Sequence, residues 1–193
     1  MTRASYDVLV VGAGAAGMTA AIEAGRRGRR VLVVGAGFEP GKQIVVVLGH
    51  RAREIRAALT LPPGAIVAMN PDFATGQASS LRVGLDAVAE SIARAVVLLG
   101  DQPSVTAEAI RAVGEAPGPI ARATYGGAPS HPVAFDRVLW PELRAVDGDR
   151  GARDVILAHA DDVTTVEIGG GPPGDVDTDE DYRRLTSKGS GEV

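Results

Sequence analysis

One carboxylate follows the most apolar run in the chain: Val96–Leu99 leads through Gly100 to Asp101. Four consecutive apolar residues predict a strand covered on both faces, typical of a parallel sheet, and Pro103 ends it. An acid at the carboxyl end of such a strand lies where open α/β sheets bind ligands. It is well placed to hold a metal ion against a phosphate. The alternative is structural, with Asp101 or Ser104 capping the next helix.

A glycine fingerprint is the second candidate site. Gly12, Gly14 and Gly17 stand between a predicted strand, Tyr6–Val11, and a predicted helix, Met18–Arg27. In a dinucleotide site the first glycine permits a tight turn, the second admits a pyrophosphate and the third packs helix on strand. The alternative is the same backbone turn without a bound cofactor.

Residues 6–34 resemble the opening βαβ unit of FAD-dependent oxidoreductases. That unit needs an acid after its second strand to hold a ribose, but Gly35 follows Val31–Val34 here, and Glu39 stands only beyond a Gly-Ala-Gly turn. Nothing later in the chain resembles the rest of a flavoprotein. Binding of FAD or NAD therefore stands as an alternative function.

The loop after Val34 contains Gly35, Gly37 and Lys42. It is not a P-loop, because Ala36 takes the place of the first glycine and Gln43 that of the hydroxyl residue. Backbone N–H groups of a glycine-rich loop, together with one lysine, can still cradle phosphates. The alternative is a plain surface loop.

Seven motifs follow one another between residues 44 and 186. They are Val45-Val-Val-Leu-Gly-His50, Asn70-Pro71, Gly76-Gln-Ala-Ser-Ser-Leu-Arg82, Leu98-Leu-Gly-Asp-Gln-Pro103, His131-Pro132, Gly148-Asp-Arg-Gly-Ala-Arg153 and Asp175-Val-Asp-Thr-Asp-Glu-Asp181. Together they resemble the molybdenum cofactor cytidylyltransferases, within the MobA-like nucleotidyltransferases. The resemblance implies an α/β fold of three layers, α/β/α, with a mostly parallel, Rossmann-like sheet of the nucleotide-diphospho-sugar-transferase type.

The resemblance also implies a reaction: transfer of CMP from CTP to the phosphate of molybdopterin, with pyrophosphate leaving and magnesium bound. CTP is preferred to GTP because Leu98–Pro103 is closer to the cytidylyl branch. Asp101 would hold the Mg²⁺ ion with a second acid, Asp175 or Asp177. Asp175 is favoured, because Asp177 or Thr178 stands where the last helix needs a cap. A molybdoenzyme that accepts the product is a candidate partner.

Three further groups are assigned to this site. Ser79 and Ser80 open a predicted helix, where hydroxyls bind phosphate or ribose, or else simply cap the helix. Arg82 would support the same site, or is a solvated helix residue. His131 would face the acceptor, whereas His159 is expected to be exposed.

The chain departs from the family at its beginning. Members open with a strand, then L-A-A-G-x-S-x-R-M-G and a lysine, whose cations hold the triphosphate. Here the loop at Gly12 has no cation, and the one that ends at Lys42 has no arginine. Impaired activity, or a non-catalytic remnant that keeps only the sheet, is therefore the third hypothesis.

The composition excludes several classes of function. A net charge of −4 gives no basic excess for nucleic acid, and the absence of cysteine excludes thiolate chemistry and disulfides. No apolar run reaches about 18 residues, and no signal peptide is recognised, so we expect no membrane partner and a cytoplasmic location. We expect residues 1–186 to form one domain with an atypical segment, 1–43, and residues 187–193 to be a disordered tail.

Alternating strand-like and helical patterns support the α/β assignment. Predicted strands beyond Val34 are Ile44–Leu48, Ala65–Met69, Val96–Leu99, Ile120–Thr124, Pro132–Phe135 and Val163–Ile168. Predicted helices are Ala52–Leu59, Ser79–Arg94, Thr106–Val113, Arg137–Ala145, Gly151–Ala160 and Thr178–Leu185.

Overall fold

The computed structural model describes residues 7–11, 43–59, 61, 64–102, 104–176, 178, 180–181 and 183–184, with only the backbone described for residues 7–11 and 58. Its strands are β1 (Asp7–Val11), β2 (Ile44–Leu48), β3 (Ile66–Met69), β4 (Arg94–Leu99), β5 (Ile120–Tyr125), β6 (Ala128–Asp136) and β7 (Val163–Glu167). Its helices are α2 (Ala52–Ala58), α3 (Gln77–Ala87), α4 (Ala107–Glu115), α5 (Trp140–Ala145) and α6 (Arg153–Ala158), joined by short 3₁₀ turns.

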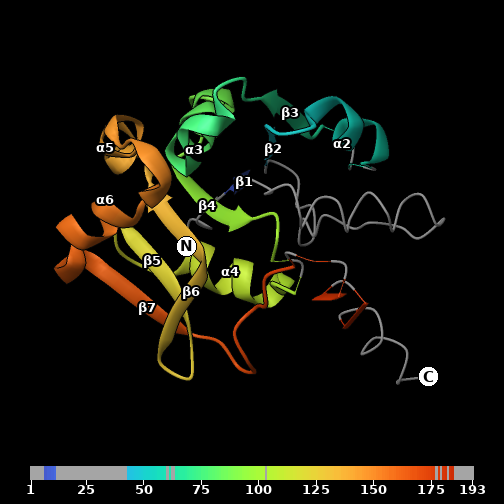
Figure 1. The fold of residues 1–193 in the computed structure, drawn as a ribbon. Coiled ribbons are helices and arrows are strands. Elements are labelled where there is room, and N and C mark those ends of the chain that lie inside the picture. The colour runs from blue at the N-terminus through green and yellow to red at the C-terminus, as the bar shows by residue number, and fades with distance from the viewer. Residues whose placement is uncertain are drawn as a thin grey trace.

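The described strands form one twisted sheet in the order β3-β2-β1-β4-β6-β5-β7 (Figure 1). Strands β3, β2, β1 and β4 are parallel, whereas β6 runs antiparallel to both β4 and β5. β7 returns parallel to β5 at the far edge. The mostly parallel sheet predicted from the sequence is therefore confirmed, with one antiparallel strand inserted beside β4.

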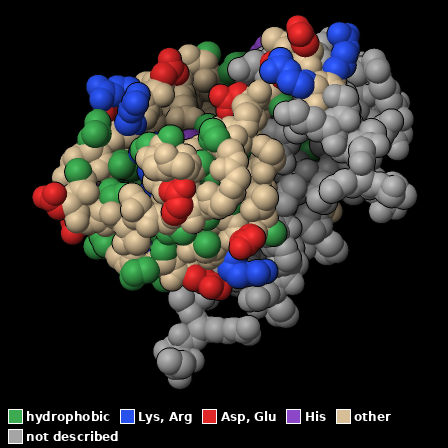
Figure 2. Space-filling view, turned by 90° about the horizontal axis from the view of Figure 1, so that it is seen from below, with side chains coloured by type: hydrophobic (Ala, Val, Ile, Leu, Met, Phe, Trp, Pro, Cys, Tyr) green, Lys and Arg blue, Asp and Glu red, His purple; other side chains and the backbone are tan. Residues whose placement is uncertain are grey.

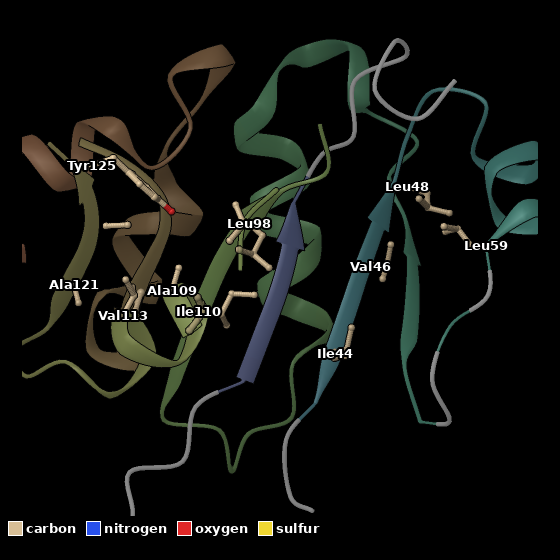
Figure 3. Close-up of a cluster of buried hydrophobic side chains, with 14 of the residues drawn as sticks. Ile44, Val46, Leu48, Leu59, Leu98, Ala109, Ile110, Val113, Ala121 and Tyr125 are labelled. Atoms are coloured by element: carbon tan, nitrogen blue, oxygen red, sulfur yellow. The ribbon is translucent and has the colours of Figure 1, made fainter. Parts of the chain in front are cut away.

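Side chains of β2 and β4 alternate strictly between the two faces of the sheet, as the pleat requires. Val96 and Leu98 of β4 join one core cluster with residues of α2 and α4 (Figure 3). Ala95 and Val97 join the second cluster with residues of α3, α5 and α6. Helices thus cover both faces, which gives the expected three layers and explains why β4 is apolar throughout its second half.

The helix predicted over Ser79–Arg94 is wrong at both ends. α3 begins at Gln77 and ends at Ala87, and Val88 is extended. Arg94 belongs instead to β4, where it pairs with Asp136 across to β6 and donates to the Gly118 carbonyl at 2.7 Å. Val88 and Ile92 are still buried, although they lie in the connection between α3 and β4. The helical spacing therefore indicated burial correctly, but not the secondary structure of these residues.

Two other predictions need smaller corrections. β6 is longer than Pro132–Phe135, because the hairpin with β5 extends its pairing back to Ala128. The two helices predicted after it are each shorter and flanked by 3₁₀ turns, at Arg137–Leu139 and Ala160–Asp162. The first change lengthens a strand, and the second replaces helix ends by 3₁₀ turns. Neither alters the three layers.

Acidic and basic side chains lie interspersed on the face shown in Figure 2, where the basic groups are separated rather than joined in one strip. Among the described residues no helix combines the length and apolar character that crossing a bilayer requires.

Leu85 is a test of the core that supports this sheet, because its side chain on α3 is 0% exposed. We expect Leu85→Ala to lower the free energy of unfolding by about 3 kcal/mol, from lost burial and the cavity left behind. Leu157→Ala is the matched control, since Leu157 on α6 is 60% exposed. Urea unfolding measures both, and equal losses would contradict the described core.

Candidate active site

Asp101 follows β4 at the carboxyl edge of the parallel strands. The register pairs Val11 of β1 with Leu99 of β4, so both strands end at the same level. The chain then turns at Gly100, and Asp101 lies partly buried in this turn. The Gln102 N–H donates to the Leu99 carbonyl at 3.3 Å, which tightens the turn. The sequence therefore placed this carboxylate at the correct edge of the sheet.

The segment that carries Asp175 returns to the same turn. After β7 the chain crosses in front of α4 to the end of β4 (Figure 1). The Val176 N–H donates to the Asp101 carbonyl at 2.8 Å, and the Gln102 side-chain amide donates to Asp175 Oδ1 at 2.9 Å. Val176 itself is buried. Two acids far apart in sequence are thus carried by backbone segments that are hydrogen-bonded to each other.

Thr178 takes the capping role that the sequence left open. Its Oγ1 accepts from the Asp181 N–H at 3.2 Å, while Asp181 Oδ2 accepts from the Thr178 N–H at 3.0 Å. This reciprocal pair is a capping arrangement. The cap is thus formed by Thr178 and Asp181 without the Asp175 side chain. Asp177 lies outside the described residues. Among those described, no group of three or more His, Asp or Glu side chains stands ready for a metal.

Asn70 ties the turn after β3 to the first turn of α3. Its side chain is 3% exposed, and its amide nitrogen donates to Ser79 Oγ at 2.8 Å and to Ser80 Oγ at 2.9 Å. Its amide oxygen accepts from the Asp72 N–H at 3.0 Å. Every polar atom of the Asn70 side chain is therefore used inside the protein.

The helix-capping alternative for Ser79 and Ser80 is wrong. α3 begins at Gln77, and its N-cap, Gly76, offers no side-chain bond. Both serine hydroxyls instead accept from Asn70, and Ser79 Oγ donates to the Gly76 carbonyl at 2.8 Å. Contact of these hydroxyls with phosphate or ribose stays a prediction.

Arg82 reaches away from the strand edge toward the loop that follows α5. It donates to the Val146 carbonyl and to Asp147 Oδ1, both at 3.0 Å. Two glycines with positive φ bring the same loop close to α3. A Cβ on Gly76 would meet the Gly148 backbone at 2.3 Å, and one on Gly151 would meet the Gln77 side chain at 2.5 Å. Arg82 therefore fixes this loop to α3 through two hydrogen bonds, and its support of a ligand stays a prediction.

The loop closes one side of a cavity of about 340 Å³ beside β4. The cavity lies between the sheet, the start of α3 and the loop that leads into α6. Its lining comprises Gln77, Leu81, Val97, Leu99, Arg122, His131, Val133, Phe135, Asp149, Arg150, Gly151, Ala152, Arg153 and Ile156. Leu99 belongs to this wall, so the cavity adjoins the strand end that leads to Asp101.

His131 lines this cavity, and its position on the acceptor side stays a prediction. Burial lowers the pKa of its imidazole to about 4, with Arg122 lowering it further and Asp175 opposing the change. The ring is therefore neutral at pH 7. His159, expected to be exposed, is 27% exposed and bonds Glu142 Oε2 at 2.8 Å.

Arg122 is the cavity residue that the sequence analysis missed. It projects from β5, and its buried Nε has no hydrogen-bond partner among the described residues. Burial and then the like charge of Arg153 lower its pKa below the ordinary value. A lone arginine inside the apolar strand Ile120–Tyr125 was the available signal, since charges are rare in covered strands.

A second hollow, an open groove of about 680 Å³, lies where β2 and β3 end. Asn70 and Pro71 form part of it, and Met69 and Phe73 line it while remaining 47% and 40% exposed. The His50 ring meets Phe73 edge-on, with centroids 5.7 Å apart. This groove offers apolar and aromatic surface at the same strand edge as Asp101.

Several predicted site residues lie outside the described residues: Gly12, Gly14, Gly17, Gly35, Gly37, Lys42 and Asp177. The predicted strand Val31–Val34, the helix Met18–Arg27 and the tail 187–193 are also outside them. Binding of FAD or NAD by the glycine fingerprint therefore stays a prediction.

Comparison with known proteins finds one family model and one curated relative of a different kind. The model of the MobA-like NTP transferase domain matches residues 28–163. A curated relative, the ribosomal RNA dihydrouridine synthase of Escherichia coli K12, is 41% identical over 68 residues, which cover 35% of this chain and 16% of that protein. The chain thus matches only a small part of that protein's length.

Solved structures match over almost the whole chain. Rv0371c from Mycobacterium tuberculosis H37Rv has a TM-score of 0.73 at 30% identity, over 96% of this chain and 100% of that one. The structure of Rv0371C in complex with manganese gives 0.70 at 29% identity, over 96% and 100%. A nucleotidyl transferase from Methanothermobacter gives 0.69 at 21% identity, over 95% and 96%, which shows the fold.

The lowered pKa of His131 predicts a pH dependence of stability. Between pH 6.5 and about 4 the unfolded chain takes up a proton that the folded protein excludes. This contribution is complete above pH 6.5 and is lost as pH falls toward 4. The free energy of unfolding of the parent protein should fall between pH 7.5 and 5, and in His131→Gln this fall should be smaller by about 2 kcal/mol. Urea unfolding in EDTA measures it, and equal pH dependence in both proteins would contradict a buried neutral imidazole.

Asn70 predicts a second effect on stability. Asn70→Ala removes two donated bonds and leaves the buried Ser80 hydroxyl and the partly buried Ser79 hydroxyl without their donor. We therefore expect a loss of about 2–3 kcal/mol in the free energy of unfolding. Thr75→Ala in the same turn removes one exposed bond and should cost less than about 0.5 kcal/mol. Equal costs in denaturant unfolding would show that the Asn70 network does not hold the turn.

Proposed function

Because the chain belongs to the family of the MobA-like NTP transferase domain, we propose that it is a magnesium-dependent nucleotidyltransferase. In the proposed reaction, CMP passes from CTP to the phosphate of molybdopterin. The observation that carries the proposal is the pairing of the Asp101 turn with the Asp175 segment at the carboxyl edge of the sheet. A molybdoenzyme that receives the product belongs to the same proposal.

The residues present fit a hard divalent ion. Asp101 and Asp175 are carboxylates, and Mg²⁺ is bound in proteins by one or two such oxygens together with water and substrate phosphates. When bound there, a divalent ion supplies charge neutralisation for the triphosphate. The relative Rv0371C, solved in complex with manganese, supports a divalent-ion site in this group of proteins.

The proposed chemistry needs no general base. A phosphate monoester is anionic at pH 7, and its oxygen attacks the α-phosphorus of CTP. A new P–O–P linkage forms, the bond to the β-phosphate oxygen breaks, and pyrophosphate leaves with that electron pair. Catalysis then consists of positioning and electrostatic stabilisation. The site suits this, since its one cavity imidazole, His131, is neutral and buried.

Two hollows divide the substrates between them in this proposal. The groove at Met69 and Phe73 offers stacking surface for the nucleoside. The cavity at Arg122 and His131 receives the acceptor. Leu48 lines the groove and Leu99 the cavity, so both hollows adjoin carboxyl ends of strands in the sheet.

The proposed function is tested by pyrophosphate release from CTP and from GTP, each with molybdopterin and with or without Mg²⁺. We expect release with CTP and Mg²⁺, and Asp101→Asn to lower kcat/KM about a hundredfold through loss of one electrostatic contact. Asp161→Asn, in an exposed turn after α6, is the matched control and should retain full activity.

Three results would overturn the proposal: no release from the parent protein with any acceptor, equal activity of the two variants, or turnover that continues in EDTA. A rise in melting temperature with FAD or NAD, and none with CTP and Mg²⁺, would favour the dinucleotide hypothesis instead.

A further inference from the structure

Arg122 has a hydrogen-bond donor that no described group of the protein accepts. Its Nε is buried without a hydrogen-bond partner among the described residues, and no described carboxylate pairs with it. A buried N–H without a partner is costly, and proteins normally give such a group a hydrogen-bond acceptor. The guanidinium faces a cavity of about 340 Å³. Its missing partner therefore belongs in that cavity.

The charges around the cavity indicate the sign of that partner. Three arginines line it against one aspartate, Asp149. Arg150 is paired with Asp154 at 2.8 Å, whereas Arg153 has no carboxylate partner among the described residues. Burial and, after it, the like charge of Arg153 lower the pKa of Arg122, so the two cations lie close enough to interact. An anion between them would relieve this repulsion and supply hydrogen-bond acceptors to both.

The backbone around Arg122 also departs from regular pairing. The register between β5 and β6 shifts between Arg122 and Thr124. Irregularities of this kind re-aim side chains and occur often beside ligand sites. Arg122 pairs with Val133, which lines the same cavity. The strand thus presents the guanidinium to the cavity rather than to a neighbouring carboxylate.

We propose that Arg122 is the residue that binds the phosphate of the acceptor substrate, with Arg153 as the second cation on the same group. This inference rests on the proposed function for the name of the acceptor, but its binding step does not need turnover. A phosphomonoester carries up to two negative charges, which match two guanidinium groups, and the planar arginine fork fits its oxygens. Arg122 is accordingly a specificity-determining residue and not a metal ligand.

The test uses inorganic phosphate as the probe, at constant ionic strength and without nucleotide. Titration is followed through the Nε–H resonance of Arg122 in a ¹H–¹⁵N spectrum, assigned by its disappearance in Arg122→Lys. We expect phosphate to shift this resonance and Arg122→Met to bind phosphate ten- to a hundredfold more weakly. Arg122→Lys should be intermediate, since it keeps the charge and loses the fork. Arg111→Met, on the exposed face of α4, is the matched control and should bind as the parent does.

Melting temperature separates this role from a structural one. If Arg122 exists to bind a ligand, Arg122→Met removes a partly buried cation whose Nε–H has no partner among the described residues. The ligand-free protein should then melt at an unchanged or higher temperature. A clear fall in melting temperature would assign Arg122 to the fold and overturn the inference. Unchanged phosphate affinity in Arg122→Met would also overturn it, as would malonate displacing phosphate at equal concentration.

The two proposals fail in different ways. Loss of phosphate selectivity at Arg122, while Asp101→Asn still slows pyrophosphate release as expected, removes the inference and leaves the transferase intact. Selective phosphate binding in a protein that never releases pyrophosphate keeps the anion site and removes the transferase.

Discussion

The burial of β4 on both faces is the constraint on which the rest of the site depends. β4 is held between β1, which runs parallel to it, and β6, which runs antiparallel. Its residues Ala95–Leu98 are all buried, on alternate sides of the sheet. Both neighbours hold β4 in register toward the edge of the sheet, and at that edge the chain turns through Gly100 into Asp101. The apolar run is thus what delivers a carboxylate to a defined position.

Antiparallel insertion of β6 gives the site its second half. Because β6 enters beside β4 in reverse, its early residues, including His131, lie near the carboxyl end of β4. β5, which precedes β6 in the hairpin, adds Arg122, and after β7 the chain returns to Asp101 through Val176. An all-parallel sheet would place helix connections there instead. The mixed sheet therefore lets one continuous stretch of chain, from β5 to Asp175, wrap around the end of one strand.

Sequence reasoning succeeded where local pattern and tertiary environment agree. The strands Ile44–Leu48 and Val96–Leu99 were found because apolar runs indicate burial whatever packs against them. It failed at Arg94, because its pairing with Asp136 is a contact forty-two residues away in sequence that no local pattern records. Helix capping by Ser79 and Ser80 was wrong as an alternative for the same reason, since Asn70 donates to both hydroxyls from outside the helix. Arg122 was missed because the sequence does not show that its Nε–H has no hydrogen-bond partner among the described residues. That is seen only once the cavity is assembled from distant segments.

The electrostatic arrangement separates the two ends of the site. Asp101 and Asp175 make one end acidic, whereas Arg122 and Arg153 make the cavity end basic. His131 lies between them electrically, since Arg122 lowers its pKa and Asp175 raises it. Its neutral ring therefore adds no charge to either end, and burial keeps it so at physiological pH. A protonated imidazole there would weaken the carboxylates' hold on a cation and compete for an anion. In the proposed reaction, a neutral ring would leave the acidic end of the site to the cation and the basic end to the anionic acceptor.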